Sequence, residues 1–360
     1  MPGLTYSIAD QNFEKTKSLG ILNLSMRLLE SMIASHAFDR LTVLSNSSIQ
    51  LPSPGAHVQI CTQDVALKGR LQRVWWDQCG VYQAAKALGN EWLFLPKGFA
   101  SFVRRPPCRL AAYVHDTMFD YYAANFPGSA PAFENTYFDR SLRATLKYAE
   151  VIFTNSDFTR AELQRYGDAR GITPPTMVTA GIGFVADALP VAVKKNQIIV
   201  LTSKWPHKRT RLAMDYISRW QSMIHYVGTV HWVGSIPDGS GLGGQANWIH
   251  HPRLPENEFR KLLGESRALL FFTNYEGFGM PPVEAMLGHT CPVYSDIPVT
   301  REVMQGMGQA FNNDDFESFS AAMNKALTCE AAQIHAWRNK LLETHDWNQV
   351  VSRIVNALNS

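Results

Sequence analysis

The sequence has little charge and no long apolar run. Asp, Glu, Lys and Arg together make up only 18% of its 360 residues, whereas 46% of the residues are hydrophobic. A disordered chain has the opposite balance, with many charges and too few apolar side chains to form a core. No apolar run approaches the roughly 18 residues that span a bilayer, and residues 1–20 lack the basic-then-apolar pattern of a secretory signal. We therefore expect a globular, cytoplasmic protein.

Cysteine is scarce as well, and the net charge is small. The five cysteines are odd in number, widely spaced and never arranged as C-x-x-C, which argues against a disulfide framework and a zinc site. We expect them to be buried or half-buried thiols. A formal charge of +3 is too small for a protein that wraps nucleic acid, so no nucleic-acid partner is expected.

The positive surplus lies in the first half of the chain, where cations mix with aromatic residues. Residues 1–185 have 18 basic and 15 acidic side chains, and residues 186–360 have 16 of each. Two clusters mix both kinds: Lys68, Arg70 and Arg73 with Trp75 and Trp76, and Lys97, Arg104 and Arg105 with Phe99 and Phe102. Membrane-surface patches have this composition, and so do ordinary solvated loops; both interpretations stay open. For the two tryptophans, core packing is the simpler alternative to stacking on a sugar or a lipid.

Short β-branched or aromatic runs alternate with stretches of helical periodicity. In the first half, the predicted strands are residues 4–8, 41–44, 92–95, 110–114, 151–154 and 176–179, and the predicted helices are residues 21–33, 131–148 and 156–166. Strands that alternate with helices form a parallel sheet. Asn155 or Ser156 is expected to cap the third helix, because a short polar side chain accepts hydrogen bonds from the free N–H groups there.

A second alternation follows residues 186–195, which have no periodicity. Its predicted elements are strands 198–202, 229–233 and 268–272, helices 208–223 and 256–264, further elements at 283–287 and 291–294, and three final helices from residue 315, the last over 347–358. At roughly 150 residues per domain, the length also predicts two domains. We assign residues 1–185 to the first α/β domain, residues 186–343 to the second, and residues 344–360 to a closing helix too short to fold alone.

The strongest local pattern is the stretch of residues 274–286, directly after a predicted buried strand. Gly277 and Gly279 allow backbone N–H groups to approach a ligand closely. Pro281 and Pro282 suit a helix entry, where a missing N–H does no harm. Because the helix N-terminus that follows favours an anion, a diphosphate fits this site.

Two glutamates accompany this loop. We place Glu284 in the first turn of the helix, where the helix dipole stabilises a carboxylate that can also bind a ribose diol, and Glu276 in the loop facing the same crevice. The alternative is that both residues only cap the helix. Seven residues separate them within the stretch EGFGMPPVEAM, which closely resembles the E-x7-E motif of retaining glycosyltransferases of family 4, and the match continues to residue 303.

Other segments are similar to the same family. They are Gly20-Ile21 before the first helix, His115-Asp116 after strand 110–114, Asn155-Ser156 with Phe158-Thr159, and His345-Asp346-Trp347. The resemblance implies the GT-B fold: two facing Rossmann-like domains, an active site in the central cleft, and a C-terminal helix that crosses back to the first domain. It also implies that Gly20 and Ile21 form an acceptor loop and that His115 contacts the transferred sugar, while Asp116 caps the following turn.

The resemblance further implies a set of donor-binding residues. Lys208, in Pro206-His207-Lys208, matches the family's P-x-K lysine for the diphosphate. The family's second cation, an arginine, is replaced by Thr202 or Ser203, with Lys204 as a displaced substitute. Glu284 would bind the ribose and Glu276 the sugar hydroxyls. The donor residues are then Ser203, Lys204, Arg253, Leu254, Gly277, Phe278, Gly279, Met280 and Glu284, and the catalytic residues are His115, Glu276 and Lys208.

Several other patterns do not form a site. His250 and His251 lack a third ligand at a suitable spacing, and we expect them in the loop before Arg253. Asp314 and Asp315 are expected to begin a helix. No metal and no cofactor are therefore expected. The sequence has neither G-x-S-x-G nor a G-x-G-x-x-G that opens a helix, which argues against a hydrolase and a dehydrogenase.

The resemblance implies a retaining, metal-independent hexosyltransferase. It favours GDP-mannose as the donor, with a UDP-sugar next, and a glycan or lipid-linked acceptor in cell-surface polysaccharide synthesis, such as that of an O antigen. The protein would then be cytoplasmic, with contact to the inner face of the membrane through its first domain. Two alternatives stay open: a GT-B-fold sugar-nucleotide epimerase or hydrolase, and a catalytically silent scaffold that binds a sugar nucleotide.

Overall fold

The structure is a computed structural model that describes residues 3–12, 19–51, 55, 57–129, 131–186, 192–238, 242 and 245–360. It divides the chain into two compact units. Unit 1 comprises Met1–Phe184 together with His345–Ser360, and unit 2 comprises Val185–Thr344. The predicted domain limits, 185/186 and 343/344, fall within one residue of these divisions. Residues 187–191, part of the segment 186–195 that lacks periodicity, lie outside the described residues.

Unit 1 is built on a parallel sheet of seven strands in the order β3-β2-β1-β4-β5-β6-β7. The strands are β1 (Leu4–Ser7), β2 (Leu41–Ser45), β3 (Val58–Thr62), β4 (Trp92–Leu95), β5 (Arg109–Val114), β6 (Val151–Thr154) and β7 (Thr176–Thr179). The apolar run Trp92–Leu95 is buried along its whole length, because helices cover both faces of a parallel sheet. The six strands predicted in this half are confirmed to within one residue at either end.

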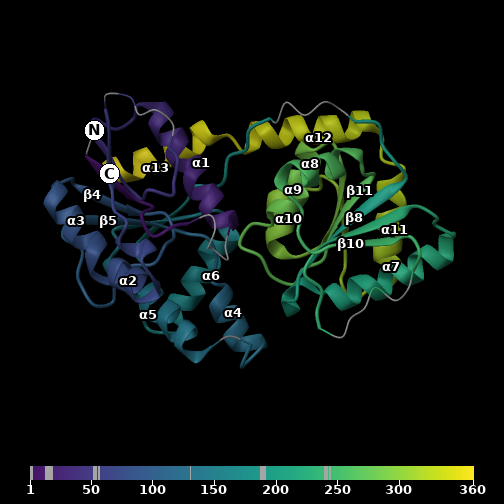
Figure 1. Cartoon of the computed structure of the whole chain (residues 1–360), viewed down its shortest axis with the longest axis horizontal. Helices are drawn as coiled ribbons and strands as arrows, with labels where there is room; N and C mark the ends of the chain where they lie inside the picture. Colours follow the sequence, from purple (N-terminus) through teal and green to yellow (C-terminus); the bar gives the residue numbers. More distant parts are fainter. Residues whose placement is uncertain are drawn as a thin grey trace. The chain divides into compact units, whose positions relative to one another are not determined.

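Helices cover this sheet, and residues from the far end of the sequence complete the cover (Figure 1). They are α1 (Leu19–Ser35), α2 (Arg70–Trp75), α3 (Val81–Leu88), α4 (Met118–Asn125), α5 (Ala132–Tyr148), α6 (Asp157–Asp168) and α13 (Trp347–Asn359). Ser156 caps α6 as expected, since its Oγ accepts a hydrogen bond from the Thr159 N–H. The helix α13 packs against α1, β6 and β7, so unit 1 contains the segment that the family resemblance assigns to a closing helix.

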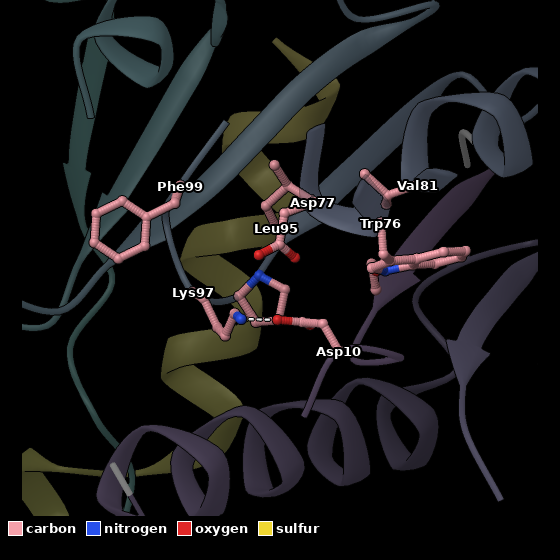
Figure 2. Close-up of a pocket in the computed structure, with 9 residues that line it drawn as sticks. Asp10, Trp76, Asp77, Val81, Leu95, Lys97 and Phe99 are labelled. Atoms are coloured by element: carbon pink, nitrogen blue, oxygen red, sulfur yellow. Dashed lines mark ion pairs between the residues drawn. The ribbon is translucent and has the colours of Figure 1, made fainter. Parts of the chain in front are cut away.

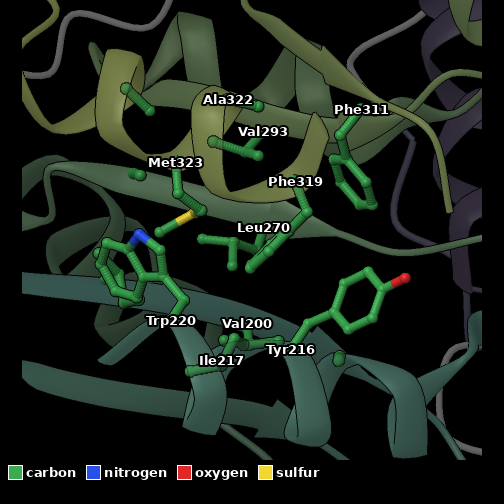
Figure 3. Close-up of a cluster of buried hydrophobic side chains, with 14 of the residues drawn as sticks. Val200, Tyr216, Ile217, Trp220, Leu270, Val293, Phe311, Phe319, Ala322 and Met323 are labelled. Carbon is green, nitrogen blue, oxygen red and sulfur yellow. The ribbon is translucent and has the colours of Figure 1, made fainter. Parts of the chain in front are cut away.

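Unit 2 has a parallel sheet of six strands in the order β10-β9-β8-β11-β12-β13. The strands are β8 (Gln197–Thr202), β9 (Thr229–Gly234), β10 (Trp248–His251), β11 (Ala268–Phe271), β12 (Cys291–Ser295) and β13 (Gln309–Phe311). The helices are α7 (Thr210–Ile224), α8 (Glu256–Glu265), α9 (Met280–Leu287), α10 (Pro298–Met304), α11 (Phe316–Leu327) and α12 (Ala331–Thr344). Figure 3 shows Trp220 of α7 and Phe319 of α11 in the core over Leu270 of β11.

Three strands and two local details differ from the sequence-based expectation. The strands β3, β10 and β13 lie at sheet edges and were not expected. Because β10 extends through His251, His250 and His251 lie in a strand and not in the loop before Arg253. The predicted helix 208–223 begins at Thr210, because residues 206–208 form a separate turn and Arg209 is left-handed.

The cysteines and the apolar helices agree with the expectations from the sequence. All five cysteines are free; Cys291 is buried and the other four are half-buried, as expected. In the part of the chain that the structure describes, no helix combines the length and the apolar composition needed to cross a bilayer.

Candidate active site

The predicted donor residues gather at one edge of the unit 2 sheet. Adjacent parallel strands β8 and β11 end at the same edge, so the loops that follow them lie together. The first loop leads to α7 and the second to α9. A backbone hydrogen bond of 2.8 Å joins the loops, with the Asn274 N–H donating to the His207 carbonyl oxygen. Segments almost 70 residues apart in sequence therefore meet here.

Lys208 and Glu276 form an ion pair between these loops. The Lys208 Nζ lies 2.5 Å from Oε1 of Glu276, and the Thr273 hydroxyl donates to the same oxygen over 2.8 Å. The ammonium also lies 4.5 Å from the centroid of the Phe271 ring. Only 23% of the lysine side chain and 15% of the glutamate side chain are exposed. A partly covered pair of this kind can exchange one partner for a charged or hydroxylated ligand.

The neighbouring His207 stays neutral. Its Nε2 lies 4.0 Å from Oε1 of Glu276. Burial, with a smaller effect of the Lys208 charge, lowers the pKa of His207 to about 3. At neutral pH the imidazole therefore adds no positive charge to the pair, and the Lys208 ammonium balances the Glu276 carboxylate.

A second cation, Arg209, stands beside Lys208 and was not predicted. Its backbone is left-handed, with φ of 49°, and its guanidinium donates to Oδ1 of Asn274 over 3.4 Å and to Oδ1 of Asp314 over 2.9 Å. The predicted substitute, Lys204, has an exposed side chain, and its backbone N–H donates to Ser235 Oγ. The consecutive cations of Lys208-Arg209 are the sequence signal that could have pointed to Arg209.

The glycine loop enters α9 through a left-handed residue. Gly279 has φ of 85° and ψ of 59° and directly precedes Met280, the first residue of the helix. Only glycine adopts this conformation without strain. Pro281 and Pro282 lie inside the first turn and have no N–H. The N–H groups available to an anion at this end are therefore fewer than in an ordinary helix.

Glu284 does not lie in the first turn of α9, contrary to the prediction. The two prolines belong to the helix, which begins at Met280, so Glu284 is its fifth residue. Burial raises the pKa of this carboxyl, the Arg260 charge lowers it, and Glu256 raises it. Because both of those neighbours belong to α8, Glu284 is close to α8, and the helix dipole contributes less to it than expected.

The other predicted donor residues take different positions around the same edge. Ser203 stabilises its own loop, since its N–H donates to Thr210 Oγ1 over 3.1 Å and its carbonyl oxygen accepts from the same hydroxyl. Gly277 and Phe278 are buried beside Gly279, and Met280 is half-buried. Arg253 is exposed and Leu254 is half-buried, two and three residues after β10.

In unit 1, His115 follows β5 at the carboxyl edge of the sheet. It is buried, and its Nε2 lies 2.6 Å from the carbonyl oxygen of Pro96, to which it donates in the neutral ring. Burial lowers the pKa of His115 to about 4, against a smaller opposing effect of that hydrogen bond. Its own carbonyl oxygen accepts from Asn155 and Thr159. Asp116 caps the following turn as expected, accepting from the Met118 N–H over 2.9 Å.

A small pocket opens beside Pro96, at the ends of β1 and β4. Figure 2 shows Lys97 and Asp10 pointing toward each other in it, near the carboxylate of Asp77. Lys97 forms an ion pair with Asp10, so it is not part of an exposed basic cluster with Arg104 and Arg105, which corrects that prediction. Burial raises the pKa of Asp77 to about 6. The pocket therefore offers a cation and two carboxyl groups.

Two further predictions for unit 1, the loop at Gly20-Ile21 and the burial of the two tryptophans, hold only in part. Gly20 and Ile21 lie within the first turn of α1, which begins at Leu19, and not in a loop before it. The helix therefore begins two residues before the predicted start at residue 21. Trp76 is buried, as the simpler interpretation predicts, whereas Trp75 is exposed.

Within the described ranges, no group of three or more His, Cys, Asp or Glu side chains is arranged to hold a metal ion. His231 and His251 do approach each other, with Nδ1 of the first 3.0 Å from Nε2 of the second. Burial lowers the pKa of both, so at neutral pH they form a hydrogen bond between uncharged rings.

Comparisons with known proteins agree with this geometry. Residues 240–341 match the family described as "Glycosyl transferases group 1". The chain is 28% identical over 144 residues to the O-antigen chain mannosyltransferase RfbU of Salmonella typhimurium, covering 38% of this chain and 40% of that protein. It is 24% identical over 245 residues to the O-antigen chain mannosyltransferase B of Escherichia coli, covering 61% and 63%. The matches thus span less than two thirds of either relative.

A solved structure covers the whole chain. Sucrose-phosphate synthase from Thermosynechococcus elongatus aligns with a TM-score of 0.70 at 13% identity, over 100% of this chain and 98% of that one. The protein therefore has the GT-B fold, made of two Rossmann-like units. Within that class, it is a relative of the group 1 glycosyl transferases. The resemblance drawn from the sequence is confirmed at the level of this group.

Proposed function

We propose that the protein is a retaining glycosyltransferase that moves a hexose from a nucleoside-diphosphate sugar to a glycan or lipid-linked acceptor in cell-surface polysaccharide synthesis. The Lys208–Glu276 pair at the shared edge of β8 and β11 is the observation that carries the proposal. The pair supports the proposal because it combines a cation, which suits a diphosphate, with a carboxylate, which suits sugar hydroxyls. Similarity to two O-antigen chain mannosyltransferases favours GDP-mannose over a UDP-sugar as the donor in this proposal.

In this proposal the cations leave their protein partners for the diphosphate. Lys208 and its neighbour Arg209, with the N–H groups of the glycine loop, stabilise the negative charge that develops on the departing diphosphate. Glu276, once released by Lys208, accepts hydrogen bonds from the sugar hydroxyls, and Glu284 binds the ribose. Two cations match roughly two negative charges, so the proposed reaction requires neither a divalent metal nor a cofactor.

The proposal also includes one residue of unit 1, His115. The family resemblance assigns it a contact with the transferred sugar. Its pKa, lowered to about 4 by burial, keeps the ring neutral at the pH of the cytoplasm, where we propose that the protein works. A neutral ring can hydrogen-bond a sugar hydroxyl without repelling the oxocarbenium-like charge that develops at the anomeric carbon.

The first test is the thermal stability of the protein with GDP, UDP, CDP and dTDP. A ligand at a hundred times its dissociation constant stabilises a protein by about 2.7 kcal/mol, so we expect a clear rise of the melting temperature with GDP. Lys208→Met should lose this rise, because it removes the diphosphate cation. Glu276→Gln should keep or increase it, because the Lys208 charge is then no longer balanced. Lys340→Met, a change of an exposed lysine on α12, is the matched control.

A melting rise that survives Lys208→Met would contradict this site. With GDP-mannose, product analysis then separates the reactions: an anomer-retained glycoside supports transfer, whereas mannose or an epimer released without acceptor would indicate a hydrolase or an epimerase. A GDP-dependent rise without any turnover, with acceptor extracts supplied, would indicate a scaffold that only binds the nucleotide.

A further inference from the structure

We propose that one face of unit 1 docks on an anionic lipid surface. This face, called here the arginine-aromatic face, is formed by α2, residues 102–105 and the first turns of α5. Its apolar members are Leu71, Trp75, Phe102, Val103 and Phe133. The inference does not depend on the proposed reaction, since it uses none of the residues assigned to donor binding or catalysis.

Exposed large apolar side chains of unit 1 concentrate on this face. Leu71 is 82% exposed, Phe133 62%, Val103 61%, Trp75 45% and Phe102 37%. Among the described residues of unit 1, Ile60 is the one other large apolar side chain with comparable exposure. Scattered apolar residues need no explanation, but a concentrated group on a surface marks an interaction site.

Direct contacts join the three segments into one surface. The Arg70 guanidinium lies 5.7 Å from the centroid of the Phe133 ring, and the Arg140 guanidinium lies 6.0 Å from that of Phe102. The rings of Phe102 and Tyr137 meet edge to face at 5.9 Å. The Phe102 N–H also donates to Gln78 Oε1 over 3.0 Å. Figure 1 shows α2 beside α5 at one end of the unit.

Arginines accompany the apolar side chains in these segments. Arg70, Arg73, Arg104, Arg105 and Arg140 belong to the same three segments. Arg104 and Arg105 have no ion-pair partner among the side chains that the structure describes. The carboxylates nearby are Glu134, which is paired with Arg70 over 3.2 Å, and Asp77, whose Oδ2 accepts from Tyr137 over 3.0 Å. The three segments thus combine exposed apolar side chains with more arginines than carboxylates.

This combination fits a lipid surface better than other partners. Apolar side chains at an interface enter the boundary between headgroups and acyl chains, and arginines attract anionic headgroups. A second copy of the chain bound through this face would bring arginines against arginines, because a two-fold contact pairs the same patch with itself. Bound nucleic acid would leave Leu71, Val103 and Phe133 without an apolar environment.

The test is co-sedimentation of the full chain with vesicles. We expect binding to phosphatidylcholine vesicles that contain phosphatidylglycerol, little binding to phosphatidylcholine alone, and weaker binding as salt shortens the range of electrostatic attraction. The double variant Phe102→Ser/Val103→Ser should lower partitioning by about tenfold or more, and so should Arg104→Gln/Arg105→Gln. Val227→Ser/Ile249→Ser, which changes exposed apolar residues of unit 2, is the matched control and should bind like the wild type.

Each variant is also melted with and without GDP. An unchanged melting temperature shows that the variant is folded, and an unchanged GDP shift separates loss of docking from loss of the proposed donor site. Equal binding to neutral and anionic vesicles would overturn the inference, as would wild-type binding by both variants. A concentration-dependent dimer abolished by Phe102→Ser/Val103→Ser would assign the face to self-association and overturn the lipid surface.

Discussion

His115 illustrates how a single buried side chain links the site to pH. Its Nε2 hydrogen bond to Pro96 and its burial keep the ring neutral in the folded state. In the unfolded chain the same ring has its ordinary pKa of about 6.5. Between the two pKa values the unfolded state binds a proton that the folded state does not, so protonation favours unfolding there.

We therefore expect His115 to destabilise the protein in acid. Its contribution to the free energy of unfolding is intact above pH 6.5 and falls by about 3 kcal/mol as the pH drops toward 4. His115→Gln keeps a neutral donor but cannot titrate. Its stability, measured by urea unfolding at several pH values, should decline less in this window than that of the wild type. Parallel pH curves for the two proteins would show that the ring does not titrate as described.

Also at the residue scale, the motif residues could be predicted from sequence but their partners could not. Lys208 and Glu276 each lie in a recognisable local pattern, so both were found. Their ion pair spans 68 residues, and the contact of Lys97 with Asp10 spans 87, so neither follows from spacing. Arg209 was missed because its role depends on Asn274 and Asp314, which the folded loops bring to it.

At the scale of elements, the entry to α9 depends on one backbone conformation. Gly279→Ala would place a Cβ 3.5 Å from Thr300 Cγ2 and 4.0 Å from Phe271, which are ordinary contacts. The cost is therefore conformational, about 1–2 kcal/mol for a left-handed alanine. We expect this loss in thermal unfolding, together with weaker GDP binding, because the loop shifts.

Gly20→Ala is the matched control for this change. Gly20 is helical, and an added Cβ meets nothing within 4 Å. Alanine should stabilise α1 by about 0.5–1 kcal/mol. If both substitutions lowered the stability, the left-handed backbone at Gly279 would not explain the loss in Gly279→Ala.

Position in the sheets accounts for most of the strands that the sequence did not reveal; the edge strand β7 is the exception, because its Thr- and Val-rich run stands out although none of its residues is fully buried. The central strands are apolar on both faces, so runs such as Ala268–Phe271 stand out. Edge strands need only one neighbour and can be half-exposed. Val58–Thr62 has three exposed residues, and Trp248–His251 has none fully buried. Because these segments lack an apolar run, their sequence cannot be distinguished from that of a loop. They form strands because the neighbouring strand offers free backbone hydrogen-bonding groups.

At the scale of the whole molecule, the chain leaves unit 1 near residue 184 and returns to it at residue 345. Two hydrogen bonds hold the returning segment: the Phe184 N–H donates to the His345 carbonyl oxygen over 2.8 Å, and the Arg353 guanidinium donates to the Ala180 carbonyl oxygen over 2.9 Å. Val350, Ile354 and Leu358 of α13 are buried. The stability of unit 1 is therefore expected to depend on residues that lie beyond unit 2 in the sequence.

Ile354→Ala should thus destabilise unit 1 and leave unit 2 unchanged. Removing most of a fully buried isoleucine costs about 2–5 kcal/mol. Amide hydrogen exchange should accelerate in β1, β5 and β6 and stay unchanged in β8 and β11. Ile217→Ala, at an equally buried position in α7, is the reciprocal control and should accelerate exchange in unit 2. Uniform acceleration by either variant would show that the two units unfold as one.

The return of the chain also sets an order of events at the ribosome. A domain made first in a chain ordinarily folds while the rest is being synthesised. Unit 1 cannot complete its folding in this way, because α13, which packs on α1, is made only after residues 185–344 have been translated. At a synthesis rate of about 5–20 residues per second, the apolar flank of α1 stays uncovered for roughly 8 to 30 seconds. During that interval this apolar surface stays exposed, and unit 2, made later, is the first of the two units that can fold completely.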